Sequence, residues 1–233
     1  MPIKPSSEVN GDLTFQPVGS SQAFFNGDIT LKPNEVNPVI DAILANGLVF
    51  QAEHQHFYDF DPPVWFIHFR GLGALIALAT AVHKVVKATS TPLPQQPPSH
   101  PTTPLDADRL QRILHGYDAE VGEDGVVTVF VARKEPIFIA GVRVRPQTNI
   151  ETNIAIAFEP LTRSGARVAA APDFGMLASE VDPVMRSCGR RAGTSAACTT
   201  RRPTSTRSCS SPTSSRPASP TSSPGRSAAA STG

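Results

Sequence analysis

The chain has 233 residues, of which 39% are hydrophobic, so it is long enough for one large or two small domains with a buried core. Its formal net charge of +1 argues against attraction of the whole chain to nucleic acid or to a membrane surface. The start, MPIKPSSEVNGD, has no apolar signal-peptide region, and the most apolar stretch, residues 71–82, is shorter than the roughly 20 residues that cross a bilayer. From the sequence as written, we therefore expect a cytoplasmic protein without a transmembrane segment.

Residues 1–88 form a first unit in which short strands alternate with helices. Apolar residues at periods of two and 3.6 predict elements in the order ββαββα. Strands are expected over 12–17, 22–30, 49–60 and 64–69, and helices over 34–46 and 72–87. Because consecutive strands with short turns pair as antiparallel hairpins, the expected class is α+β.

Three histidines belong to the second hairpin of this unit. His54 and His56 alternate along AEHQHFYDF and so point to one strand face, and His68 lies in VWFIHF after a turn at Pro62. A turn centred on Pro62 places position 56 opposite position 68, where Cβ atoms lie about 4.5–5.5 Å apart. The pattern therefore predicts that the three imidazoles lie close together.

The three histidines are the candidate metal ligands. Three imidazoles and a water form an open site for Zn, and the same geometry with a carboxylate can hold Fe or Cu. Asp61 is near in sequence, but Glu53 and Asp59 are expected to point to the opposite strand face, so water is the expected fourth ligand. The alternative is that the imidazoles pack on the sheet and bond neighbouring polar groups without metal.

A second unit over residues 106–186 follows a Pro-rich linker over residues 89–105. TFQP and EVNPVI of the first unit recur in the second as AFEP and EVDPVM, which indicates a duplicated domain. A helix is expected over 106–114 and strands over 126–132 and 137–144, before AFEP. The first unit has no counterpart of that helix and first strand, and the second lacks a histidine hairpin. Both units are therefore expected to be incomplete.

Residues 187–233 differ in composition from the rest of the chain. They contain no Val, Ile, Leu, Met, Phe, Tyr or Trp and are rich in Ser, Thr, Pro and Arg. Such a segment cannot bury enough apolar surface to offset its ordering entropy, so a disordered tail is expected. Alternatively, the arginines of this segment form an arm that binds nucleic acid. We nevertheless expect no nucleic-acid partner.

The other motifs are weaker candidates for a functional site. Gly71-Leu72-Gly73 precedes a helix, but position 76 is Ile, so the dinucleotide fingerprint is incomplete and no nucleotide cofactor is expected. Close helix packing explains these glycines better. Trp65 is expected in the core or beside the histidines in a pocket, and His83 is expected to be partly buried.

A resemblance to the LppY/LpqO-like family, a bacterial domain of unknown function, is carried by NGDLTFQPVGSSQAFFNGD, EVNPVIDAILANG, HQHFYDFDPPVWFIHF and EVDPVM. It covers residues 3–186 and implies a duplicated domain with exported or lipoprotein relatives. It implies no activity, so whether the protein is an enzyme stays open.

The leading expectation is a metal-binding protein of the bacterial envelope, a hydrolase or oxidoreductase if it is catalytic, whose partner is an unknown small molecule or envelope component. The alternative is a non-catalytic ligand-binding or structural module without metal.

The apolar pattern stops within the helix that EVDPVM begins. A change of reading frame after residue 186 would explain this, and the alternative is a genuine disordered tail. In a shifted frame the codon of Thr213 can encode a histidine at the position equivalent to His68. We expect the nucleotide sequence of codons 180–233 to encode an apolar hairpin in another frame. Its absence from both other frames would contradict the hypothesis.

Overall fold

The computed structural model describes residues 4–7, 9–56, 60–91, 93, 102–145 and 152–190. Within these residues the chain is a mixed α+β protein with antiparallel sheets, as predicted. Most of the predicted linker over 89–105 lies outside them. Helix α4 (Ala178–Arg190) passes residue 187, where the tail was predicted to begin, and the rest of the predicted tail lies outside the described residues.

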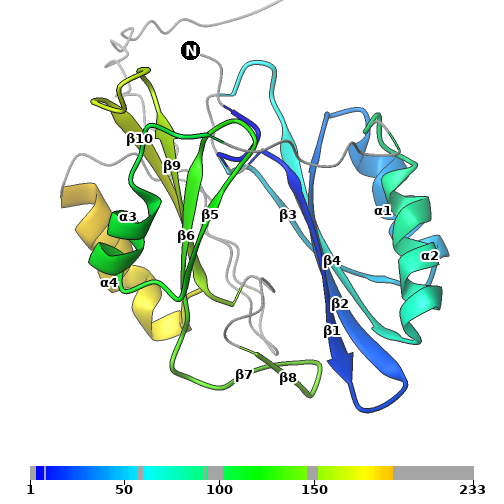
Figure 1. Cartoon of the computed structure of the whole chain (residues 1–233). Coiled ribbons are helices and arrows are strands. Elements are labelled where there is room, and N and C mark those ends of the chain that lie inside the picture. The colour runs from blue at the N-terminus through cyan, green and yellow to red at the C-terminus, as the bar shows by residue number, and fades with distance from the viewer. Residues whose placement is uncertain are drawn as a thin grey trace, which may run out of the picture.

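The first sheet has four antiparallel strands in the order β1-β2-β4-β3, and helices α1 and α2 cover one of its faces (Figure 1). Its hairpins and helices follow the predicted order ββαββα. The elements are β1 (Gly11–Val18), β2 (Gln22–Leu31), α1 (Val36–Ala45), β3 (Val49–His54), β4 (Trp65–Gly73) and α2 (Leu75–Val86).

The helix-covered face of this sheet holds the hydrophobic core. Phe25 of β2 and Phe69 of β4 are fully buried there and meet edge to face, with ring centroids 5.1 Å apart. Val39 and Ile43 of α1 and Val85 of α2 are also fully buried in this cluster. Burying one side chain of this size stabilises the fold by about 1.5–3 kcal/mol. The core therefore holds both helices on one face, and the opposite face combines polar residues with buried aromatic side chains such as Phe66.

The second sheet has the order β10-β9-β6-β5 and faces the first, with helices α3 and α4 on its outer side (Figure 1). Strands β9 and β10 and helix α4 repeat β1, β2 and α1. A separate two-stranded hairpin, β7-β8, lies between β6 and β9 in the chain. The elements are α3 (Ala107–Leu114), β5 (Asp118–Val121), β6 (Val127–Val131), β7 (Ile137–Ile139), β8 (Val142–Val144), β9 (Ile154–Pro160), β10 (Val168–Phe174) and α4.

Two details of the second unit differ from the prediction. Strand β5 was not predicted, and the single strand expected over 137–144 is the hairpin β7-β8. Ala140 and Gly141, the two residues between its strands, have φ values of 50° and 79°. Positive φ at both central residues is the type I′ turn that matches strand twist. Alanine rarely adopts this conformation, so the apolar run concealed the turn.

Two equivalent residues, Gln16 of TFQP and Glu159 of AFEP, join the two units. The N–H of Arg145 donates to Gln16 Oε1 at 2.9 Å. In the reciprocal contact, the N–H of Lys4 and the hydroxyl of Ser7 donate to Glu159 Oε2 at 3.3 and 2.8 Å. Gln16 and Glu159 are only 4% and 5% exposed. Each unit thus holds the segment that precedes the matching strand of the other, and we call this pair of contacts the reciprocal clasp.

A second repeated pair consists of Glu35, which caps the start of α1, and Glu180, which lies in the first turn of α4. In each unit a carboxylate oxygen accepts the N–H of the residue three positions earlier, Lys32 or Leu177, at 2.7 Å. The contact is local, so it follows from the shared motifs EVNPVI and EVDPVM. The other Glu35 oxygen accepts the N–H of Ser90 at 2.6 Å, which ties the start of α1 to the segment after α2.

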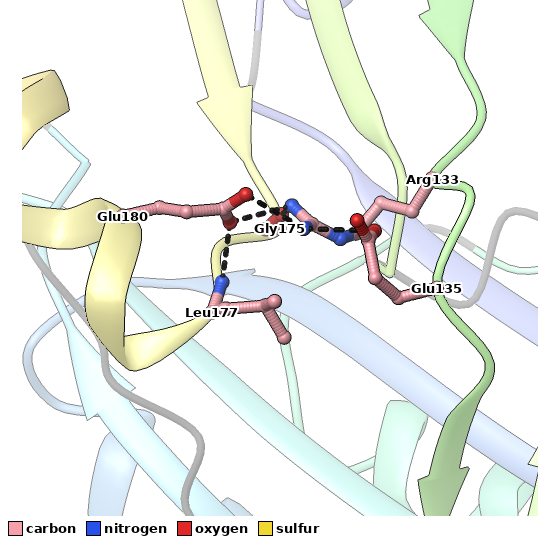
Figure 2. Close-up of polar contacts among 5 residues, drawn as sticks. All are labelled: Arg133, Glu135, Gly175, Leu177 and Glu180. Carbon is pink, nitrogen blue, oxygen red and sulfur yellow. Dashed lines mark hydrogen bonds and ion pairs between the residues drawn. The ribbon is translucent and has the colours of Figure 1, made fainter.

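At Glu180 the long-range contact is made by Arg133 and corresponds to that of Ser90 with Glu35, as Figure 2 shows for Arg133 and Glu180. The two terminal nitrogens of Arg133 each lie 2.9 Å from a different Glu180 oxygen, and Nη1 also donates to the carbonyl of Gly175 at 2.6 Å. Glu135 lies 3.0 Å from Nη2. The hydrogen bond from Arg133, followed by that from the N–H of Leu177, lowers the pKa of Glu180. This two-pronged geometry fixes the first turn of α4 against the end of β6.

The reciprocal clasp gives a stability prediction. Glu159→Ala leaves the Ser7 hydroxyl buried without this acceptor, and we expect a loss of about 1–3 kcal/mol in the free energy of unfolding. Glu159→Gln, which copies the residue type at position 16, keeps one acceptor oxygen and should lose less. Urea unfolding measures both. An alanine variant as stable as the parent protein would contradict the role of the clasp.

Glu35 gives a pH prediction. Burial raises its pKa, but the hydrogen bonds from Ser90 and Lys32 outweigh burial and bring the pKa below the ordinary value of 4.5. A carboxyl with a lowered pKa contributes stability that is fully present above that ordinary value and is lost as pH falls through the folded value. The stability difference between the parent protein and Glu35→Gln should therefore be largest near neutral pH and shrink below pH 4.5. Urea unfolding at a series of pH values tests this, and a constant difference would refute it.

Candidate metal site

The three predicted histidines come together on the face of the first sheet opposite the helices, which we call the inner face. His68 lies in the middle of β4 and is 4% exposed. His54 is the last residue of β3, and His56 follows it on the connecting segment, both of them partly buried. One ring nitrogen from each histidine lies within 4.8 Å of the others. The predicted proximity is confirmed.

The predicted register of the hairpin is wrong, although its conclusion holds. Position 56 was placed opposite His68, whereas the residue opposite His68 is Ala52, and His54 lies opposite Phe66. The ladder shifts between Phe50 and Ala52, where the β3 strand carries one extra residue. Because of this shift the strand ends at His54, and His56 reaches the cluster from the connecting segment.

Stacked aromatic rings hold the cluster in place. The rings of His54 and His68 are nearly parallel, with an interplanar angle of 4° and centroids 4.8 Å apart. The ring of His56 stacks on Phe66 at 3.6 Å, and Phe66 is 1% exposed. Phe66 is therefore a rigid platform for a histidine that has no place in the strand ladder.

Asp28 of β2 is a member of the site that the sequence interpretation missed. It lies directly opposite His68 in the β2–β4 ladder. Its Oδ2 atom is 3.7 Å from His68 Nε2 and 3.9 Å from His56 Nε2. An available signal was a charged residue within the otherwise buried strand FFNGDITL. Its partner strand could not be inferred locally, because α1 and β3 separate β2 from β4 in the chain.

The candidate ligand atoms lie farther apart than in a metal site, so they would have to move together to hold an ion. A tetrahedral ion with bonds of about 2.0–2.1 Å holds its ligand atoms about 3.4 Å apart. The two Asp28 distances, 3.7 and 3.9 Å, exceed this by a few tenths of an ångström. The nitrogens, all within 4.8 Å of one another, need larger adjustments, which His56 can make because it lies outside the ladder.

Further acidic groups lie beside the cluster. Asp12 of β1 is the residue opposite Asp28 on the inner face. The pKa of Glu120 on β5 is raised by burial and then by the negative charges of Asp118 and Asp12. A site with several carboxylates and imidazoles favours a cation over an anion.

The other predicted acids do not join the site. Glu53 pairs with Ile67, a core residue on the helix-covered face, so it points away from the histidines as predicted. Asp61 is exposed, and Asp59 lies outside the described residues.

The structure also shows the surroundings of Gly71, Trp65 and His83. A Cβ atom on Gly71 would come within 2.7 Å of Leu78 of α2, so close helix packing explains this glycine. Trp65 packs against the hydrophobic core, on the face away from the histidines. His83 is exposed on α2 rather than partly buried, because the buried stripe of that helix is formed by its neighbours Val82 and Val85.

The family model described as Domain of Unknown Function (DUF1259) matches residues 1–88 and again residues 108–194. The chain belongs to this family. The two matches show that the DUF1259 domain is duplicated, as the repeated motifs predicted. The exact boundaries predicted for the two units stay predictions, as does the LppY/LpqO resemblance.

No curated protein and no solved structure matches the chain. Among the described helices of this DUF1259 protein, none has the length and apolar character needed to span a membrane.

Proposed function

We propose that the protein binds one divalent transition metal ion through His54, His56 and His68, with Asp28 as the adjacent carboxylate. The observation that carries the proposal is the convergence of three imidazoles and one carboxylate from three strands and a connecting segment. Imidazole and carboxylate donors together suit Zn, Fe and Cu.

The role of Asp28 separates two kinds of chemistry. With Asp28 as a direct ligand, a tetrahedral Zn site is filled, whereas Fe or Cu with more ligands keeps an open position for an oxidoreductase reaction. With Asp28 as a hydrogen-bond partner of a histidine or water, three imidazoles leave one open position on Zn. A water bound there has its pKa lowered to about 7 and can act in hydrolysis.

A non-catalytic module without metal is the second candidate. The stacking of His54 on His68 and of His56 on Phe66 favours it, because these contacts stabilise the cluster by themselves. Protonated His56 and His68 would also pair with Asp28 across 3.9 and 3.7 Å.

The setting is proposed from the LppY/LpqO resemblance alone, whose relatives look exported or lipid-anchored. On that basis the partner is a small molecule or a component of the bacterial envelope.

Metal content distinguishes the two candidates. Purified protein incubated separately with Zn, Fe or Cu and then desalted should retain about one equivalent of at least one metal, measured by elemental analysis. A His54→Ala/His56→Ala variant should retain none, and Asp28→Asn should hold the metal at least tenfold more weakly.

His83→Ala is the matched control, because His83 is exposed on α2. Circular dichroism checks that each variant is folded. Equal retention of metal by the parent protein and the double variant would refute the proposal, and so would a parent protein that retains no metal.

A further inference from the structure

Arg70 lies one row from the histidine cluster on the same inner face. It follows His68 by two residues on β4, so both side chains leave the same face of the strand about 7 Å apart. The cross-strand partner of Arg70 on β2 is Asn26, just as Asp28 is the partner of His68. Arg70 and Asn26 therefore form the row next to the proposed metal ligands.

Within the part of the chain that the structure describes, the Nε atom of Arg70 has no hydrogen-bond partner. This N–H is a donor, and it is buried without an acceptor. Placing a charged group in a partly buried site without a direct ion pair is unfavourable. Arg133 also has a buried Nε without a partner, but its terminal nitrogens pair with Glu180 and Glu135, whereas no ion pair joins Arg70 to any described residue. Arg70 thus has the properties of a residue that binds a ligand.

Asn26 supplies a second unused polar atom in the same row. Its side chain is 2% exposed, and Oδ1 has no hydrogen-bond partner among the described residues. Buried amide oxygens are nearly always bonded. An Oδ1 atom accepts hydrogen bonds, so it complements a hydroxyl or N–H donor, whereas the guanidinium fork complements an anionic pair of oxygens.

The row is also within reach from solvent. Arg70, His54 and His56 are each partly exposed, whereas His68, Asn26 and the Nε atom of Arg70 are buried. A small ligand that approaches the partly exposed side meets the arginine and the histidines together. The spacing of about 7 Å between rows is that of a ligand with a few heavy atoms.

We propose that Arg70 and Asn26 anchor the anionic oxygen group, a carboxylate or a phosphate, of a small ligand whose other end reaches the metal at the histidine cluster. The inference rests on the proposed metal site, since the nearby Asp28 and Asp12 would repel an anion without a cation between them. An anionic ligand is thus specified, which the three histidines alone do not do.

The test uses glycolate, which carries a carboxylate and a hydroxyl, and inorganic phosphate as probes. Thermal unfolding of metal-loaded protein is followed at increasing concentrations of each, and elemental analysis gives the metal content of the same samples. At least one anion should raise the unfolding temperature of the parent protein. The effective one shows whether the group is a carboxylate or a phosphate.

Arg70→Met should retain its metal but bind the effective anion at least tenfold more weakly. Its unfolding temperature without anion should equal or exceed that of the parent protein, because methionine removes an unpaired charge at similar length. Arg70→Lys keeps the charge but lacks the fork, so its affinity should also fall. Arg109→Met, at an exposed position on α3, is the control and should behave like the parent protein.

Three outcomes would overturn the inference. Unchanged anion binding by Arg70→Met with a full complement of metal would leave the metal site standing and remove the anchor. A marked fall in the unfolding temperature of Arg70→Met without anion would assign Arg70 a structural role. Metal-loaded parent protein that responds to neither anion would also exclude this ligand class, whereas loss of the metal itself from the parent protein is a failure of the metal proposal.

Discussion

The register between β2 and β4 is the constraint on which the first unit and its site depend. Alternation along these two strands sends Phe25, Ile67 and Phe69 to the helices and sends Asp28 and His68 to the inner face. A slip of one residue in either strand would exchange the two faces. It would bury a carboxylate and an imidazole under α1 and α2 and expose the aromatic core. The hydrophobic core therefore fixes the geometry of the polar site on the opposite face.

The two units are related by more than repeated sequence, because equivalent residues make equivalent contacts. Glu35 and Glu180 each close the turn before a helix, and Gln16 and Glu159 each hold a segment from the other unit. In the clasp, an uncharged amide at one position corresponds to a carboxylate at the other. The two sheets nevertheless differ: β2 pairs with β4 in the first, whereas β10 is an edge strand in the second. The histidine site therefore belongs to the first sheet alone within the described residues.

Adjacent rows of the inner face carry groups that favour ions of opposite charge. The row of Asp12, Asp28 and His68 favours a cation, and the neighbouring row of Asn26 and Arg70 favours an anionic group. A metal bound as proposed would offset the charge of the carboxylates and let an anionic ligand bridge the two rows. The arrangement differs from that at Arg133, where fixed carboxylates already neutralise the guanidinium.

Local patterns in the sequence determined the α+β class, the duplication, the order of elements in the first unit and the proximity of His54, His56 and His68. These features follow from periodicity, repeated motifs and a nearby turn, all of which act over short stretches of chain. The tertiary structure decided the register that the extra residue in β3 creates, and it placed Asp28 opposite His68 and Asn26 opposite Arg70. Both contacts depend on the pairing of β2 with β4, strands that are distant in sequence. That pairing is selected by the burial of both strands under two helices, a property of the assembled core that no single segment contains.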